Sequence, residues 1–178
     1  NFMDGIDGLV GGCFAVILLS SSFLVGPSIL PLTGSIIGFL ILNWSPSKVF
    51  MGDSGSTFLG AVLTCLVFSS NNLSNSFALL LIALPILADS FICVIRRFAN
   101  RENIFEAHKL HLYQRLYQGG WTHQKISSIY IISTIFLSSA YLFFGFKLLL
   151  TTTVFVLMFG VYLDKTIAVP FCNRKFNS

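Results

Sequence analysis

The chain has 178 residues, of which 54% are hydrophobic and 10% charged, with a mean hydropathy of +0.81 and 19 phenylalanines. Soluble domains carry about one quarter charged residues, so this composition excludes a soluble globular protein and predicts an integral membrane protein in contact with a lipid bilayer. The net charge of +4 does not indicate nucleic acid as a partner, because the basic residues lie in loops between long apolar runs.

Six apolar stretches predict an all-α fold, a polytopic transmembrane helix bundle that forms one integral membrane domain over residues 1–178. A spanning helix needs about 17 to 25 residues, and the third stretch reaches this length only with the small residues of the preceding turn. Pro31 and Pro85 lie within stretches, where a helix bundle tolerates a kink. The stretches are 9–26, 28–44, 57–70, 77–95, 127–145 and 148–163.

Six spans place every second loop on the same side of the membrane. Ten of the eleven basic residues then fall on one side, and only Lys147 falls on the other. Basic residues concentrate in cytoplasmic loops, so this distribution predicts that the chain start, the turn at 48–56, the loop at 96–126 and the carboxyl tail face the cytoplasm.

The chain begins with the polar motif NFMDGIDGLVGG. Asp4 and Asp7 are three residues apart and share one face if the segment is helical, with Asn1 one turn earlier. Paired acids with an amide at a helix end can hold a hard cation or a nucleotide. The alternative is an acidic, glycine-rich terminus exposed to water.

A second polar motif, KVFMGDSGSTFLGA, runs from Lys48 to Ala61 with Asp53 at its centre. The glycines and small hydroxyl residues around Asp53 let the backbone approach a bulky anion, and a metal on Asp53 would bridge to it. The alternative is a solvated turn that caps the next helix. GDSGS also imitates the nucleophile segment of chymotrypsin-like proteases, but those need a soluble β-barrel, so that interpretation is excluded.

Asp89 is the ionisable residue that lies well inside an apolar run, seven residues before Arg96 on the same helical face. An acid in a membrane helix is a functional candidate by default. Two interpretations stay open: a structural partner of Arg96 and a residue that lines a site.

The loop at 96–126 predicts one amphipathic helix over 104–118, since Asn103 with Glu106 resembles a capping box and Gly119-Gly120 a stop. A cationic row suited to phosphates would lie on one of its faces. The alternative is a basic helix that only touches lipid headgroups. The row consists of His108, His111, Arg115 and Gln118.

A zinc site built from the three histidines of this loop and its end is a weaker hypothesis. No cysteine lies near His108, His111 or His123, and the available acids favour a hard metal.

Together these motifs resemble, in the same order, those of the polyprenyl-phosphate N-acetylhexosamine-1-phosphate transferases, glycosyltransferase family 4. NFMDGIDGLVGG is similar to the family's NxxDGxDGLA, KVFMGDSGSTFLG to its KxFMGDxGSxxLG, and PILADSFICVIRR with HKLHLYQRL to its last cytoplasmic loop. The HLYQRL loop lacks the triple histidine of the phospho-N-acetylmuramoyl-pentapeptide transferases and resembles the undecaprenyl-phosphate N-acetylglucosamine-1-phosphate transferase or O-antigen branch.

The resemblance implies Mg²⁺ as the cofactor and assigns roles residue by residue. Asp53 and Asn1 would hold the metal. Catalytic roles would fall to Asp4, Asp7, Asp53 and His111. The nucleotide and its diphosphate would be bound by Asn1, Lys48, Gly52, Ser54, His108 and Arg115.

The family's paired-aspartate motif precedes NxxDG and is absent from these 178 residues. Because the chain starts in mid-motif, we expect the carboxyl-terminal part of a longer transferase, inactive on its own.

The implied reaction transfers a sugar-1-phosphate from a UDP-N-acetylhexosamine to undecaprenyl phosphate and releases UMP. The implied setting is a bacterial inner membrane and the first membrane step of O-antigen, capsule or another envelope glycan, with a homodimer as a further expectation. Within the family the alternative is peptidoglycan lipid I synthesis. Outside it, the alternatives are a transporter with broken helices and a membrane scaffold.

Overall fold

The computed structural model describes residues 3, 5–70, 72–101 and 109–171, and every regular element in this part of the chain is a helix. The predicted all-α fold is therefore confirmed. The elements are α1 (Leu9–Leu24), the 3₁₀ turn η1 (Pro27–Ile29), α2 (Leu30–Asn43), α3 (Gly52–Ser69), α4 (Leu73–Ile82), α5 (Leu84–Ala99), α6 (Leu112–Gln118), α7 (His123–Phe144) and α8 (Phe146–Thr166).

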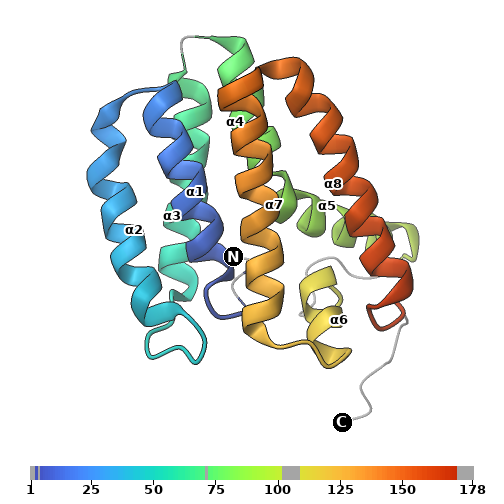
Figure 1. Cartoon of the computed structure of the whole chain (residues 1–178). Helices are drawn as coiled ribbons and strands as arrows, with labels where there is room; N and C mark the ends of the chain where they lie inside the picture. Colours follow the sequence, from blue (N-terminus) through green and yellow to red (C-terminus); the bar gives the residue numbers. More distant parts are fainter. Residues whose placement is uncertain (1–2, 4, 71, 102–108, 172–178) are drawn as a thin grey trace.

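Most of these helices run side by side, and α5 and the short α6 depart from the common direction (Figure 1). Helix α1 packs against α2, α3, α4 and α7, and α7 also packs along α8. The core between them is apolar, and its fully buried residues include Leu9, Ile17, Leu59, Ile82 and Leu137. Burial of this apolar surface holds the helices in register around the polar segments.

By length and composition, α7 and α8 are long and apolar enough to cross a membrane, among the residues described. The bent pair of α4 and α5 passes the same test together and would make a third span. Leu9–Leu24 and Pro27–Asn43 form shorter apolar helices. Of about six predicted spans, two or three thus have the full length and hydropathy of a membrane crossing.

The predicted fourth span is broken in two. Helix α4 ends at Ile82 and α5 begins at Leu84, with a bend of 70° between them. Pro85 lies in the first turn of α5, where its missing N–H costs nothing but its ring prevents the preceding helix from continuing. The bend directs α5 across the bundle, toward α6 and α8 (Figure 1).

The polar segments gather at one end of the bundle, as the parity of the predicted spans requires. Figure 1 shows the beginning of α1, the turn between α2 and α3, α6 and the end of α8 toward the same end of the bundle, and the short connections at the other. The motifs that are separated along the sequence therefore share one region of space.

The loop helix is shorter than predicted. Helix α6 covers only Leu112–Gln118, and the residues at 109–111 are not helical. The predicted capping residues Asn103 and Glu106 lie outside the described residues. The expected stop is confirmed, because α6 ends at Gly119 and Gly120 has a φ of 91° that favours glycine.

Candidate functional site

Asp7 is fixed by residues from two other parts of the chain. Its carboxylate accepts hydrogen bonds from Ser47 Oγ (2.9 Å) and backbone N (3.4 Å), and lies 3.1 Å from His123 Nδ1 at the start of α7. Its carbonyl oxygen accepts a hydrogen bond from Ser127 Oγ at 2.7 Å. Burial raises the pKa of Asp7, but the bonds from Ser47 and the charge and hydrogen bond of His123 outweigh it and lower the pKa below its ordinary value of 3.8.

Asn43, at the end of α2, joins the first polar motif to the second. Its Oδ1 accepts a hydrogen bond from Gly8 N at 3.0 Å, and its Nδ2 donates to Val49 O at 2.8 Å. Gly8 has a φ of 74°, and a β-carbon there would lie 2.8 Å from the Trp44 ring, so this turn requires glycine. The amide is buried, and it ties the approach to Asp53 to the DGxDG segment.

Asp53 lies in the first turn of α3, on the exposed end of that helix. Gly52 starts the helix with a φ of 67°, and Met51 supplies no side-chain cap. No hydrogen bond or ion pair joins the Asp53 side chain to another described residue, and Lys48 and Ser54 are exposed as well. The first N–H groups of α3 and an unpaired carboxylate thus face solvent at the polar end.

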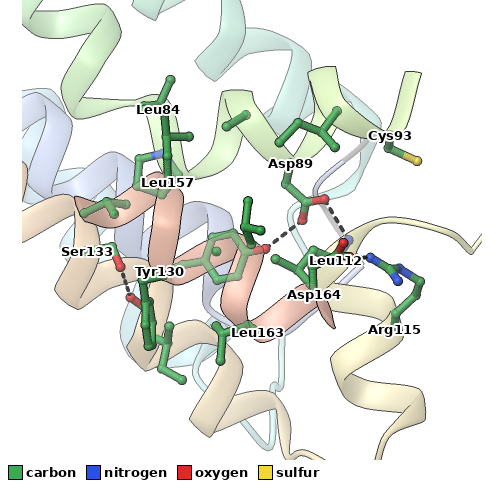
Figure 2. A pocket seen from close by; sticks show the side chains of 18 of the residues that line it. Leu84, Asp89, Cys93, Leu112, Arg115, Tyr130, Ser133, Leu157, Leu163 and Asp164 are labelled. Atoms are coloured by element: carbon green, nitrogen blue, oxygen red, sulfur yellow. Dashed lines mark hydrogen bonds and ion pairs between the residues drawn. The ribbon is translucent and has the colours of Figure 1, made fainter. Parts of the chain in front are cut away.

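Asp89 is buried at the bend side of α5 and accepts three hydrogen bonds. The donors are Leu112 N (2.7 Å) and Tyr113 N (3.2 Å) of α6, and Tyr130 Oη (2.7 Å) of α7. Figure 2 shows this carboxylate at the polar end of a cleft lined by α5, α7 and α8. Asp89 is therefore not the partner of Arg96 that one interpretation expected.

His111 lies close to this carboxylate. Its Nδ1 is 3.7 Å from Asp89 Oδ1, its side chain is 2% exposed, and its ring stacks on Tyr113 with centroids 5.6 Å apart. Tyr113 in turn lies against Gly5, since a β-carbon on Gly5 would be 2.7 Å from Tyr113 Oη. The last cytoplasmic motif thus packs on the DGxDG segment.

Arg115 is buried in an ion pair with Asp164 of α8, and it also donates to Val169 O at 2.9 Å. Arg96 reaches the same carboxylate through two hydrogen bonds of 3.1 and 2.5 Å. Burial, followed by the charge of Arg96, lowers the pKa of Arg115. The guanidinium groups lie over the ring of Phe171, 5.4 and 5.5 Å from its centroid.

The predicted cationic row is therefore arranged differently from the expected surface face. His111 and Arg115 point into the protein, and Gln118 is exposed, with its Nε2 donating to Lys109 O at 3.2 Å. His108 lies outside the described residues.

The structure joins Asp7 to Ser47 and His123, and it sets Gly5 against Tyr113, two residues after His111. Asn43 joins Gly8 to Val49 of the second motif. Asn1 and Asp4 lie outside the described residues. Among those described, no group of three or more histidine, cysteine or acidic side chains is arranged to hold a metal ion.

Sequence reasoning missed several polar residues that build this end of the bundle. Asn43 and Tyr130 are polar residues at the end of an apolar run or within one, and this position could have indicated a role. The sequence around Ser47 gives no such indication. His123 was considered only for zinc, but it pairs with Asp7 and contacts the Tyr117 ring edge-on at 4.7 Å. Asp164 is a further residue that the motifs do not include, although it is an acid directly after the last apolar stretch.

Fold and site together define a class: an apolar bundle of membrane-type helices with acids, histidines and arginines collected at one end. Residues 1–71 match the family model described as Glycosyl transferase family 4. This match and the relatives below support the resemblance predicted from the motifs.

The probable undecaprenyl-phosphate N-acetylglucosaminyl 1-phosphate transferase of Bacillus subtilis (strain 168) is 36% identical over 155 residues, which cover 79% of this chain and 43% of that protein. The phospho-N-acetylmuramoyl-pentapeptide-transferase of Trichormus variabilis is 34% identical over 155 residues, covering 76% and 40%. The decaprenyl-phosphate N-acetylglucosaminephosphotransferase of Mycobacterium leprae is 30% identical over 157 residues, covering 71% and 39%.

The chain spans about two fifths of the length of these curated relatives, as the covered shares of 43%, 40% and 39% show. No solved structure gives a significant match. The three relatives share in their names the transfer of a phosphorylated sugar, and two of them name a polyprenyl phosphate.

Proposed function

We propose that this chain is part of an integral membrane enzyme that transfers a sugar-1-phosphate from a UDP-N-acetylhexosamine to undecaprenyl phosphate and releases UMP. The observation that carries the proposal is the convergence of three polar motifs at one end of an apolar bundle. Tyr113 packs on Gly5, and Asn43 joins Gly8 to Val49. A transporter or a scaffold would not require these acidic motifs to lie together.

The chemistry of transfer between phosphates suits such a site. A phosphate monoester has a second pKa of about 6, so the lipid phosphate is largely ionised at neutral pH and needs little help from a base. Its oxygen attacks the phosphorus that carries the sugar, in line with the leaving UMP. Positioning and neutralisation of charge then supply most of the catalysis.

Asp53 fits a magnesium site of the kind that nucleotide enzymes use. Mg²⁺ keeps several waters and binds through one or two carboxylates together with substrate phosphates, so it does not need the protein cage that the described residues lack. We assign Asp53 to hold it, with Asn1. When bound, the ion would neutralise the diphosphate and the charge that develops on UMP.

The remaining assigned residues would act on the substrate's phosphates and base. The uncapped start of α3 at Gly52 and Ser54 offers N–H groups to an anion. Lys48, four residues before Gly52, is exposed and is assigned to the same anion. Asp4 and Asp7 are assigned to the metal and nucleotide side. His111 is assigned to the diphosphate, together with His108 and Arg115, although Arg115 is buried against Asp164 in this structure and would have to leave that partner to reach a phosphate.

The O-antigen or capsule branch is proposed over peptidoglycan synthesis. Its support is the loop sequence, where Leu112, Tyr113 and Gln114 follow His111 in place of further histidines. We place the protein in a bacterial inner membrane, with its polar end in the cytoplasm, where nucleotide sugars are. A homodimer is proposed as the assembly.

The test is UMP release by membranes that contain the full-length parent protein, given undecaprenyl phosphate and a panel of UDP-sugars that includes UDP-N-acetylmuramoyl-pentapeptide, with and without Mg²⁺. An Asp53→Asn variant serves as the control. Release that requires lipid, Mg²⁺ and Asp53 supports the proposal and identifies the sugar. No release with any sugar from folded protein would overturn it.

A further inference from the structure

Three backbone and side-chain donors from two elements converge on one buried carboxylate of a third. Leu112 N and Tyr113 N come from the first turn of α6, and Tyr130 Oη comes from α7. The Asp89 side chain is only 4% exposed. A carboxylate buried at this depth is costly unless it is fully hydrogen-bonded, and these donors satisfy it.

The two N–H groups belong to the amino end of α6, where a helix leaves such donors without a partner of its own. Asp89 thus caps a helix from a distance of 23 residues along the chain. Gln114 completes the cap by accepting a hydrogen bond from His111 N at 3.2 Å. This explains why α6 begins at Leu112 rather than at the predicted residue 104.

The consequence lies at the polar end of the bundle. With α6 started at Leu112, Tyr113 is set against Gly5, and His111 is held between the Asp89 carboxylate and the Tyr113 ring. Helix α6 has only seven residues, so its own hydrogen bonds cannot fix its position.

We propose that Asp89 is a positioning residue: it pins the loop after the bent helix α5 so that Tyr113 lies against Gly5 and His111 is held beside the Asp89 carboxylate. The inference rests on the proposed transferase for its effect on turnover. The Asp89 oxygens accept hydrogen bonds from Leu112 N, Tyr113 N and Tyr130 Oη, so Asp89 is assigned a role through α6 rather than on the substrate. The Asp89 carboxylate fixes the first turn of α6 by hydrogen bonds, and the position of α6 determines where the loop before it lies.

The experiment compares three variants of the full-length protein that change groups in the same cleft (Figure 2). Asp89→Asn replaces one acceptor oxygen by a donor. Tyr130→Phe removes one of the three bonds and keeps the ring. Ser133→Ala is the matched control, because the Ser133 hydroxyl lines the cleft but bonds only its own helix, at Ile129 O (2.8 Å).

Two measurements are made on each variant: hydrogen–deuterium exchange and the kcat and KM of UMP release. Asp89→Asn should speed exchange of the peptide over 109–118 at least tenfold while α7 exchanges as before, and it should lower kcat at least tenfold with a smaller change in KM. Tyr130→Phe should change the exchange of the 109–118 peptide and kcat by a few-fold each. Ser133→Ala should change neither the exchange nor kcat.

Unchanged exchange in the 109–118 peptide of Asp89→Asn overturns the inference. So does faster exchange spread equally over α5 and α7, which would indicate a general loss of packing, and so does faster loop exchange with normal kcat. If Asp89→Asn does not fold, the exchange of the 109–118 peptide and the kcat of Tyr130→Phe test the inference instead. Hydrogen–deuterium exchange does not depend on turnover. If the parent protein releases no UMP, the proposed function is overturned, but the exchange of the 109–118 peptide still tests whether Asp89 pins the loop.

Discussion

The phenol of Tyr113 fills the space beside Gly5: a β-carbon on Gly5 would lie 2.7 Å from Tyr113 Oη and 3.2 Å from its Cε2. Tyr113 is 1% exposed, so its ring has little room to move away. One packing contact thus joins the DGxDG turn to the last cytoplasmic loop.

We therefore expect Gly5→Ala to lower the free energy of unfolding by about 1 to 3 kcal/mol, the usual cost of overpacking. Adding Tyr113→Phe removes the closest atom and should restore part of that loss. Thermal unfolding of the purified protein in detergent checks both variants.

Gly34→Ala is the matched control for this prediction, because a β-carbon at Gly34 meets nothing within 4 Å. It should leave stability unchanged or slightly raised, since alanine is the better helix former by up to about 1 kcal/mol. Equal losses for Gly5→Ala and Gly34→Ala would show that the Tyr113 contact is not tight.

Asp164→Asn should destabilise the protein by about 3 kcal/mol, because it leaves a buried arginine without its charged partner. The Arg115 side chain is 4% exposed, whereas that of Arg96 is 36% exposed and contributes less after solvent screening. Lys165→Gln, at the exposed next residue, is the control and should be neutral. A shift of the unfolding midpoint no larger than that of Lys165→Gln would refute the role assigned to this pair.

Local signals in the sequence predict the apolar helices, but not the 70° bend that divides the predicted fourth span into α4 and α5. The apolar runs mark every long helix, and the third begins at Gly52, so it does use the small residues of its preceding turn as expected. Gly119 and Gly120 mark the end of α6 because a chain leaving a helix favours glycine.

The sequence predicts which types of residue build the site, but not which of them contact one another. His123 bonds Asp7 across 116 positions, and Asp89 bonds Leu112 across 23, and no spacing rule relates such partners. The start of α6 is not predicted, in part for the same reason, since Asp89 of another helix accepts its first N–H groups beside the local capping box of His111 and Gln114. Such contacts depend on how helices pack, which their own periodicity does not specify.

Asp7 should make stability depend on pH in the acid range. Its folded pKa is lower than its ordinary 3.8, so its bonds stabilise the fold above that value, and the contribution is lost as the pH falls through the lower folded value. The difference in unfolding midpoint between the unchanged protein and Asp7→Asn should therefore be larger at pH 6 than at pH 3.

Ser47→Ala keeps the Asp7 carboxylate but removes its 2.9 Å hydrogen bond, so it should lose only part of this acid-dependent difference. A difference between the unchanged protein and Asp7→Asn that stays constant over this range would mean that the carboxylate's charge does not stabilise the fold.

Asp53→Asn should separate activity from stability. Its side chain is exposed and bonds no other described residue, so the substitution should change the free energy of unfolding by no more than about 0.5 kcal/mol. If Asp53 holds the metal, UMP release should nevertheless fall at least a hundredfold, since removing a charged group that acts on the reacting phosphates costs about 3 kcal/mol or more of the barrier. Thr57→Ala, one turn further along the same exposed face of α3, should leave both quantities unchanged. Turnover within a few-fold of the unchanged protein in Asp53→Asn would exclude Asp53 as the metal ligand and leave the alternative of a solvated turn at the start of α3.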